Sequence, residues 1–327
     1  MTPPPPRPIL LVTRKLPDAV EARAAASYDA RLSRDDSQLS PDQLVNWSQG
    51  AAAILCATMD RFDARLIASL PASVRVIGTF SVGYEHIDVA AAAARGIAVC
   101  NTPDVLSDAT AEIALLLILA ACRRATEGER LLRAGTWDGW KPTGLIGQQV
   151  SGRALGILGM GRIGQALARM AAGLGMPIHY RNRTRLPEAA ERALGATWHD
   201  SDESFLAASA VLSLHAPGGA ATWHWLDARR LALLPPGAVV INTGRGTLVD
   251  DAALIAALHS GRIAAAGLDV FEGEPNFNKA YLTAPNAVLL PHMGSATTET
   301  RHAMGMKVLD GIDAILAGTT PDNLVRP

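Results

Sequence analysis

The stretch ALGILGMGRIGQALARM (residues 154–170) places an apolar run, three spaced glycines and a helical pattern in direct succession. The run 154–158 is long enough for one buried parallel strand. Gly159, Gly161 and Gly164 then supply G-x-G-x-x-G. The first glycine permits a tight turn, the second lets a pyrophosphate approach the backbone, and the third lets the following helix pack closely. Because the N-terminus of that helix would present free N–H groups to phosphates, the stretch predicts dinucleotide binding.

Apolar runs and helical patterns alternate on both sides of this stretch, which is typical of parallel α/β structure. We expect two parallel-sheet domains: a discontinuous one of residues 1–100 and 294–327, and a Rossmann-type one of residues 101–293. The expected strands are 8–13, 51–57, 74–78, 97–100, 154–158, 177–180, 210–214, 239–242, 264–268 and 287–290. The expected helices are 18–26, 63–69, 87–95, 107–122, 124–134, 163–170, 251–260 and 297–316.

The composition is that of an ordinary globular protein and excludes several other classes. The chain has 327 residues, 49% of them hydrophobic, and a net charge of −1. It has no basic excess for nucleic acid, and its longest apolar run is too short to cross a membrane. The N-terminal MTPPPPRP lacks a signal-peptide core and reads as an extended tail. Three isolated cysteines indicate buried, reduced thiols in a cytoplasmic protein, and we expect no metal site.

Three polar residues follow expected strands, where ligands of parallel sheets bind. Arg245 follows VVINTG, Glu274 follows GLDVFEG, and His292 follows AVLLP. Each alone is typical of a surface loop. Together they supply a fork-shaped cation for a carboxylate, an imidazole for proton transfer, and a carboxylate to orient that imidazole.

These stretches resemble the D-isomer-specific 2-hydroxyacid dehydrogenases, in particular the glyoxylate/hydroxypyruvate reductase branch. The resemblance implies a Rossmann-type cofactor domain and a flavodoxin-like substrate domain. It covers most of the chain, and the matching stretches occur in family order. They are SVGYEHID (81–88), NTPDVLSDATAE (101–112), LGILGMGRIGQALA (155–168), INTGRGTLVD (241–250), AAGLDVFEGEP (265–275) and LLPHMGSAT (289–297).

The resemblance implies a role for each matched residue. Arg245 would bind the substrate carboxylate and polarise the ketone, and His292 would be the acid/base with Glu274 as its partner. Val82 and Gly83 would bind the carboxylate through backbone N–H groups, and Trp140 would reach the active site of a neighbouring subunit in a homodimer. Asp269 would receive the nicotinamide carboxamide. The implied cofactor contacts are Thr110, Gly159, Met160, Gly161, Arg162, Ile163, Gly164, Asn182, Arg183, Thr184, Arg185, His215, Pro217, Thr243, Asp269, His292 and Gly294.

One loop departs from the family pattern. The family usually follows its His-x-Pro with Leu-Thr, whereas this chain has His215-Ala216-Pro217-Gly218-Gly219. The departure leaves the side-chain contacts of this loop open.

The stretch YRNRTR (180–185) indicates the choice of cofactor. NAD-binding units place an acid about twenty residues after the first glycine, on the ribose 2′-hydroxyl. This stretch has no acid, and Arg181, Arg183 and Arg185 with Thr184 would suit a 2′-phosphate. The sequence therefore predicts NADPH as the preferred cofactor, with NADH as the second choice. The alternative is a solvated basic turn.

The resemblance implies hydride transfer from NADPH to a small 2-oxo acid, giving a D-2-hydroxy acid. Glyoxylate and hydroxypyruvate, which would give glycolate and D-glycerate, are the expected substrates. A longer acid such as 2-ketogluconate is the nearest enzymatic alternative. A nucleotide-sensing protein similar to the corepressors of this superfamily is an alternative from another class. Formate dehydrogenase and 3-phosphoglycerate dehydrogenase are weaker alternatives.

Overall fold

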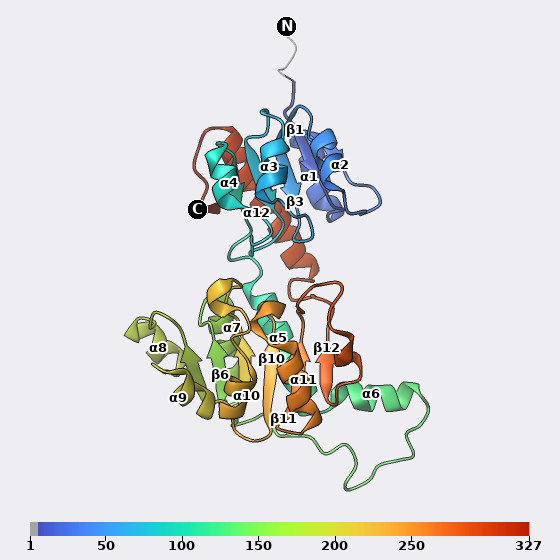
Figure 1. Cartoon of the computed structure of the whole chain (residues 1–327), viewed down its shortest axis with the longest axis vertical. Helices are drawn as coiled ribbons and strands as arrows, with labels where there is room; N and C mark the ends of the chain where they lie inside the picture. Colours follow the sequence, from blue (N-terminus) through green and yellow to red (C-terminus); the bar gives the residue numbers. More distant parts are fainter. Residues whose placement is uncertain (1–5, 327) are drawn as a thin grey trace. The chain divides into compact units, whose positions relative to one another are not determined.

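The computed structural model describes residues 6–326 and divides into two compact units (Figure 1). Residues 1–5, most of the expected N-terminal tail, lie outside the described part. Unit 1 comprises residues 1–106 and 296–327, and unit 2 comprises the continuous segment 107–295. Both changes of unit fall a few residues after the positions expected from the sequence.

Unit 1, within the described residues, holds a six-stranded sheet in the order β13-β5-β4-β3-β1-β2. Leaving out β13, this is the flavodoxin-like order, 2-1-3-4-5, with all neighbours parallel. β13 pairs antiparallel with β5, so the sheet is not purely parallel. The strands are β1 (Ile9–Val12), β2 (Asp29–Leu32), β3 (Ala51–Cys56), β4 (Val76–Thr79), β5 (Ala98–Cys100) and β13 (Leu324–Val325).

The last helix of the chain belongs to unit 1 and packs directly on its sheet. A Cβ built on Gly78 of β4 would lie 2.7 Å from Val308 Cγ2 and 2.9 Å from Ile312 Cδ1. Only a glycine lets the helix approach the strand so closely, and Figure 1 shows this red helix beside the blue and cyan elements of unit 1. The helices are α1 (Asp18–Ser27), α2 (Pro41–Trp47), α3 (Ala64–Ser69), α4 (Val89–Ala94) and α12 (Thr298–Leu316).

Unit 2 contains a seven-stranded parallel sheet in the order β12-β11-β10-β9-β6-β7-β8, counted over the described residues. Its first six strands by sequence follow the Rossmann order 3-2-1-4-5-6, and the strand order reverses between β6 and β9. The strands are β6 (Leu155–Leu158), β7 (Ile178–Arg181), β8 (Ala196–Trp198), β9 (Val211–Leu214), β10 (Ala238–Asn242), β11 (Ile263–Leu268) and β12 (Ala287–Leu289).

Helices surround this sheet, and the long apolar helix forms part of its core. Buried Leu117 and Ile118 share one hydrophobic cluster with Ile157 of β6 and Ile241 of β10. The α-helices are α5 (Ser107–Cys122), α6 (Ala125–Arg133), α7 (Arg162–Ala172), α8 (Glu188–Leu194), α9 (Asp202–Ala207), α10 (Ala228–Leu233) and α11 (Asp251–His259).

Several elements were not expected from the sequence. The edge strand β2 reads DARL and is largely solvated, so it lacks a strong apolar pattern. β13 has two residues, and α2, α8, α9 and α10 are no longer than seven. Elements this short contain too few residues for periodicity to register.

The cysteines were expected to be buried thiols, and no apolar run was expected to be long enough to cross a membrane. Cys56, Cys100 and Cys122 are buried and free. Over residues 6–326, no helix combines the length and the apolar character needed to cross a bilayer.

Candidate active site

The glycine-rich turn follows β6 at the point where the strand order of unit 2 reverses. Gly159 has φ +92°, and a Cβ there would lie 2.7 Å from Ala216 N. A Cβ on Gly164 would lie 2.5 Å from the carbonyl oxygen of Gly159. A Cβ on Gly161 would meet no heavy atom of the described residues within 4 Å. Packing thus explains the first and third glycines, whereas the second faces open space, which fits a pyrophosphate approaching there.

The loops after β9 and β10 meet beside this turn. The His215 N–H donates to Leu158 O at 2.8 Å, and its ring nitrogens lie 2.8 Å from Ser213 Oγ and 3.3 Å from Thr243 Oγ1. Burial lowers the pKa of His215 to about 4. His215 is therefore neutral near pH 7, and it links two of the expected cofactor loops as a hydrogen-bonding group.

Glu274 and His292 form a direct pair. His292 Nδ1 lies 2.8 Å from Glu274 Oε2, and Glu274 Oε1 accepts a hydrogen bond from Phe271 N at 2.6 Å. The carboxylate is therefore fixed at one oxygen and orients the imidazole with the other. The His292 side chain is 46% exposed, so its ring is accessible. With Nδ1 engaged, Nε2 is the nitrogen available to a substrate.

Asp269 holds the backbone of the His292 loop. His292 has φ +52°, a left-handed conformation that is uncommon for residues other than glycine. Its N–H donates to Asp269 O at 2.8 Å. The Asp269 carboxylate accepts from Met293 N and Gly294 N, both at 2.8 Å. Burial raises the pKa of Asp269 above its usual value, while these N–H donors act in the opposite direction. A Cβ on Gly294 would lie 3.3 Å from Thr110 Cγ2, so Thr110, Asp269 and Gly294 lie together.

The turn that carries Arg245 is held by hydrogen bonds with Asn242 and packs against the Phe271 backbone. Asn242 is 1% exposed; its Nδ2 donates to Arg245 O at 2.9 Å, and its Oδ1 accepts from Gly244 N at 3.0 Å. A Cβ on Gly246 would lie 1.8 Å from the carbonyl carbon of Phe271. The Arg245 turn therefore packs against the loop that carries Glu274. Asn242 was not identified from the sequence, where a buried asparagine at a strand end carries no distinctive pattern.

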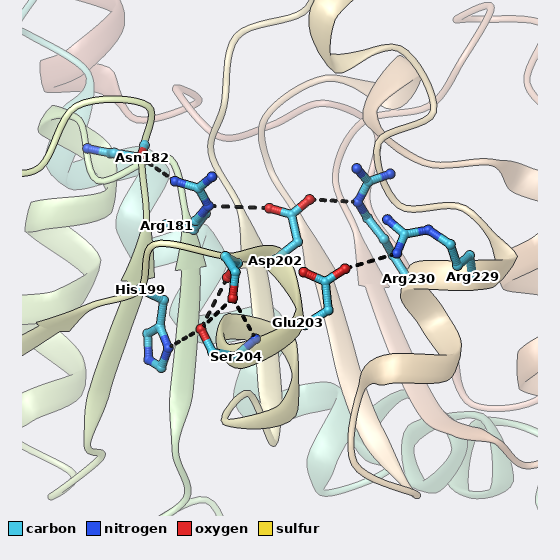
Figure 2. A network of polar contacts seen from close by, with 9 residues as sticks. Arg181, Asn182, His199, Asp202, Glu203, Ser204, Arg229 and Arg230 are labelled. Carbon is cyan, nitrogen blue, oxygen red and sulfur yellow. Dashed lines mark hydrogen bonds and ion pairs between the residues drawn. The ribbon is translucent and has the colours of Figure 1, made fainter.

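The first arginine of the basic turn is paired with an acid. Arg181 Nε lies 3.3 Å from Asp202 Oδ1, and Arg230 Nε lies 3.0 Å from Asp202 Oδ2. Figure 2 shows Asp202 between these two guanidinium groups. Arg181 also donates to Asn182 O at 2.8 Å, and Asn182 Oδ1 accepts from Met160 N at 2.7 Å. Asn182 thus holds the backbone of the glycine-rich turn, and Arg181 is held by its contacts to Asp202 and to the Asn182 carbonyl.

The third arginine is paired as well, and the second is not. Arg185 forms a bidentate pair with the buried Glu191, at 2.9 and 2.7 Å, and lies over the Trp198 ring. The contacts of Glu191 to Arg185 and to the Tyr180 hydroxyl lower the pKa of Glu191 to about 2. Arg183 and Thr184 are exposed, and within residues 6–326 Arg183 has no hydrogen-bond or ion-pair partner. The sequence predicted three arginines for the phosphate, but the structure leaves one of them unpaired.

In unit 1, hydrogen bonds hold the backbone carbonyls of Val82 and Gly83 in the loop after β4. Asn101 Nδ2 donates to Val82 O at 2.7 Å, and Ser81 Oγ donates to Gly83 O at 2.6 Å. Among the described residues, the backbone N–H groups of Val82 and Gly83 have no acceptor. Two free N–H groups in an ordered loop are suited to bind a carboxylate.

The segment after α6 exposes large apolar side chains. Trp140 is 82% exposed, and Figure 1 shows the segment between α6 and β6 as a long loop. The exposed apolar residues of α5, α6 and this loop are Leu116, Leu119, Leu132, Trp137, Trp140, Leu145 and Ile146. Large apolar side chains that stay exposed in this number favour contact with another protein.

Comparisons with known proteins find matches over most of the chain. The family model described as "D-isomer specific 2-hydroxyacid dehydrogenase, NAD binding domain" matches residues 115–294. The glycerate dehydrogenase of Hyphomicrobium methylovorum is 42% identical, over 94% of this chain and 96% of its own length. The glyoxylate reductase of Thermococcus litoralis is 41% identical, over 98% and 97% of the two chains.

A solved structure from Sinorhizobium meliloti is similar over nearly the whole chain. It is an NADPH-dependent glyoxylate/hydroxypyruvate reductase in complex with NADP and malonate. Its identity to this chain is 36% and its TM-score 0.87, covering 98% of this chain and 97% of the other.

Proposed function

Because this chain belongs to the D-isomer specific 2-hydroxyacid dehydrogenase family of oxidoreductases, we propose that it reduces glyoxylate and hydroxypyruvate with NADPH. The products would be glycolate and D-glycerate. The observation that carries the proposal is the 2.8 Å contact between His292 Nδ1 and Glu274 Oε2 in a parallel-sheet unit with an open glycine-rich turn. The named activities of the two relatives support this substrate class.

We assign the proton to His292 Nε2. The imidazolium would donate to the carbonyl oxygen of the substrate, and Glu274 would keep the ring in the required orientation and stabilise its charge. A nicotinamide held there would supply the hydride for the carbonyl carbon. Arg245 would bind the substrate carboxylate as a forked cation and polarise the carbonyl.

The residues present fit a dinucleotide. Gly161 leaves the backbone accessible to a pyrophosphate, and the N-terminal N–H groups of α7 follow it directly. Asn182 supports the turn through Met160 N, and the neutral His215 lies beside it. Thr110, Asp269 and Gly294 would surround the nicotinamide end, with Thr243 and Pro217 on the neighbouring loops.

We propose a preference for NADPH that rests on Arg183 with Thr184. Arg181 and Arg185 already bind acids, so one unpaired arginine remains for the 2′-phosphate. One charge-assisted contact is worth about 1.5–3 kcal/mol, and exposure favours the low end. We therefore expect a preference of about tenfold, smaller than three free arginines would give.

Each unit would have its own task. Unit 2 would bind the dinucleotide, and the Val82-Gly83 loop of unit 1 would bind the carboxylate through its two free N–H groups. A cytoplasmic location fits the three buried, unpaired cysteines.

We propose that the protein is a homodimer. The exposed leucines of α5 and the two tryptophans of the loop after α6 would be covered by a second copy, and Trp140 would line the pocket of that copy. Light scattering at micromolar concentration tests this directly, with a dimer mass as the expected result. A monomer with full activity would contradict the proposal.

The central experiment is a panel of 2-oxo acids assayed with NADPH and with NADH. The expected result is the highest kcat/KM for glyoxylate or hydroxypyruvate with NADPH. A higher value for 2-ketogluconate would transfer the assignment to longer acids. Cofactor binding without turnover of any 2-oxo acid would favour a nucleotide-sensing protein instead.

A further inference from the structure

Asp202 brings a carboxylate to the end of β7 from a later part of the chain. It is the first residue of α9, and its two oxygens are divided between two arginines. Oδ1 lies 3.3 Å from Arg181 Nε, and Oδ2 lies 3.0 Å from Arg230 Nε (Figure 2). The stretch 180–185, where NAD-binding units place an acid, contains none of its own. The fold therefore supplies to this strand end a charge that the stretch itself lacks.

The Arg181 guanidinium lies beside the turn that would receive the 2′-phosphate. Its Nη1 donates to Asn182 O at 2.8 Å, and Arg183 is the next residue. The same two residues border the glycine-rich turn, because Gly159 N donates to Arg181 O at 3.1 Å and Met160 N donates to Asn182 Oδ1 at 2.7 Å. Arg181 is thus a second cation at this strand end, close in the chain to the exposed Arg183.

The acids around Arg181 cancel the charge that it would offer to a ligand. Arg230 also lies 3.5 Å from Asp227, so this cluster holds two guanidinium groups and two carboxylates and has no net charge. The side chains of Arg181, Asp202 and Arg230 are only 26%, 18% and 21% exposed, so solvent screens them less than a surface pair. Among the described residues of the turn, a 2′-phosphate would meet one uncompensated cation, Arg183.

Asp202 holds Arg181 less firmly than Glu191 holds Arg185. Glu191 is buried and binds Arg185 through two contacts, at 2.9 and 2.7 Å. Asp202 gives Arg181 one oxygen at 3.3 Å, and its other oxygen serves a different arginine. Of these two neutralised arginines, Arg181 is therefore the one that a single change at a partly exposed acid would release.

We propose that Asp202 is a positioning residue that acts through Arg181 and thereby sets how strongly this protein prefers NADPH. Its carboxylate keeps the guanidinium occupied and neutralised, so the preference stays moderate and NADH remains usable. Without the carboxylate, Arg181 would become a second cation for the 2′-phosphate. The inference rests on the proposed preference for NADPH, and it adds a residue that lies outside the basic turn.

The test measures the binding of 2′,5′-ADP and of AMP by isothermal titration calorimetry. The first nucleotide carries the 2′-phosphate and the second lacks it, so the ratio of their affinities reports on this site without turnover. Asp202→Asn should raise the ratio about tenfold by tightening the binding of 2′,5′-ADP. Asp202→Glu restores the carboxylate and should keep the wild-type ratio.

Steady-state kinetics of glyoxylate reduction provide a second readout. Asp202→Asn should raise the ratio of kcat/KM for NADPH to that for NADH about tenfold, and the gain should appear as a lower KM for NADPH. The gain should shrink as the salt concentration rises, because it comes from a partly exposed charge. Asp202→Ser, a second variant without the carboxylate, should show the same shift, and melting temperatures confirm that both variants are folded.

Glu203 offers the matched control. It is the next residue of α9 and pairs with Arg229 of α10 at 3.1 Å, with side chains that are 61% and 57% exposed (Figure 2). Glu203→Gln removes the same charge from the same helix but leaves Arg181 in its pair. This variant should change the affinity ratio and the kinetic ratio by less than about twofold.

A double-mutant cycle tests whether Asp202 acts through Arg181. Arg181→Met removes the guanidinium and keeps an aliphatic side chain. In that background Asp202→Asn should raise the affinity ratio by at most about twofold, because no guanidinium is released. An undiminished gain would overturn the inference, since the carboxylate would then act as a repulsive charge of its own.

The remaining outcomes separate this inference from the proposed function. An unchanged affinity ratio in Asp202→Asn would overturn the inference. Weaker binding of both nucleotides by a folded Asp202→Asn variant would overturn it as well, because Asp202 would then support the cofactor site as a whole. A wild type that binds both nucleotides but reduces no 2-oxo acid would remove the proposed function, and the two binding measurements would still decide the role of Asp202.

Discussion

The sheet of unit 2 carries charged side chains at the ends of both its halves, and the two halves hold them differently. Beside β10, β11 and β12, Glu274 pairs with His292, a partner that can take part in the same chemistry. Beside β7, Arg181 and Arg185 pair with Asp202 and Glu191, acids that come from α9 and α8. The fold pairs Arg181 and Arg185 with acids that neutralise them, whereas the Glu274–His292 pair leaves the imidazole accessible.

The largest effect on activity is expected from changes in the half of the unit 2 sheet that holds β10 to β12. His292→Gln keeps a hydrogen bond to Glu274 but cannot deliver a proton, so kcat for glyoxylate reduction should fall about 10²–10⁴-fold. NADPH binding, measured by fluorescence titration, should remain nearly unchanged. If the variant retains more than about a tenth of the wild-type kcat, His292 is not the acid.

Arg245→Lys tests the other charge in the same half. Lysine keeps the charge and loses the bidentate fork, so kcat/KM for glyoxylate should fall about 10²-fold, chiefly through a higher KM. Steady-state kinetics at saturating NADPH measure the change. An unchanged KM would show that Arg245 has a structural role, like Arg181, and does not bind the substrate carboxylate.

In the half of the sheet that holds β6 to β8, the variants Arg183→Ala and Arg185→Ala form a matched comparison of an unpaired and a paired arginine. Arg183→Ala should lower the ratio of kcat/KM for NADPH to that for NADH about tenfold, since the only unpaired arginine of the turn within residues 6–326 is lost. Arg185→Ala should leave this ratio nearly unchanged and lower the melting temperature, because Glu191 loses its partner. Equal losses of cofactor preference in both variants would show that the ion pair opens when NADPH binds.

A separate effect, on stability and not on turnover, concerns His215, which follows β9 between the two halves. Its pKa is about 4 in the folded protein and near 6.5 in the unfolded chain. The contribution of the neutral ring is complete above pH 6.5. It is lost as the pH falls towards 4, because the unfolded chain binds the proton first. The free energy of unfolding should therefore fall by at most about 3 kcal/mol over this range.

His215→Gln should remove this pH dependence, and urea denaturation between pH 4 and 7 measures it. His302→Gln, at an exposed position of α12, is the control and should retain the wild-type slope. An equal slope in the His215 and His302 variants would mean that the acid-labile group lies elsewhere.

Most of the architecture could be predicted from the sequence, because it depends on strong local patterns. The run before Gly159, the spacing of the glycines and the apolar helix ending at Cys122 predict the Rossmann order found in unit 2. The His292–Glu274 pair could also be anticipated, since the carboxyl ends of neighbouring parallel strands lie at one edge.

The partners of the arginines could not be predicted, and the reason is physical. Asp202 begins α9 and Glu191 lies on α8, two short helices whose contact faces are set by packing and not by their own periodicity. Sequence spacing indicates where a charge lies along the chain, but not which neutralising group the folded protein brings to it.

The packing of α12 on β4 has a consequence for how the protein is made. Unit 2 is one continuous segment, whereas unit 1 needs residues from both ends of the chain. Gly78 meets Val308 and Ile312, and β5 pairs with β13, so these contacts join residues separated by the whole of unit 2. During synthesis, which proceeds from the N-terminus, all of unit 2 leaves the ribosome before α12 does. The sheet of unit 1 therefore carries an uncovered apolar face around β4 until α12 has been synthesised, and long-range closure of this kind is slow.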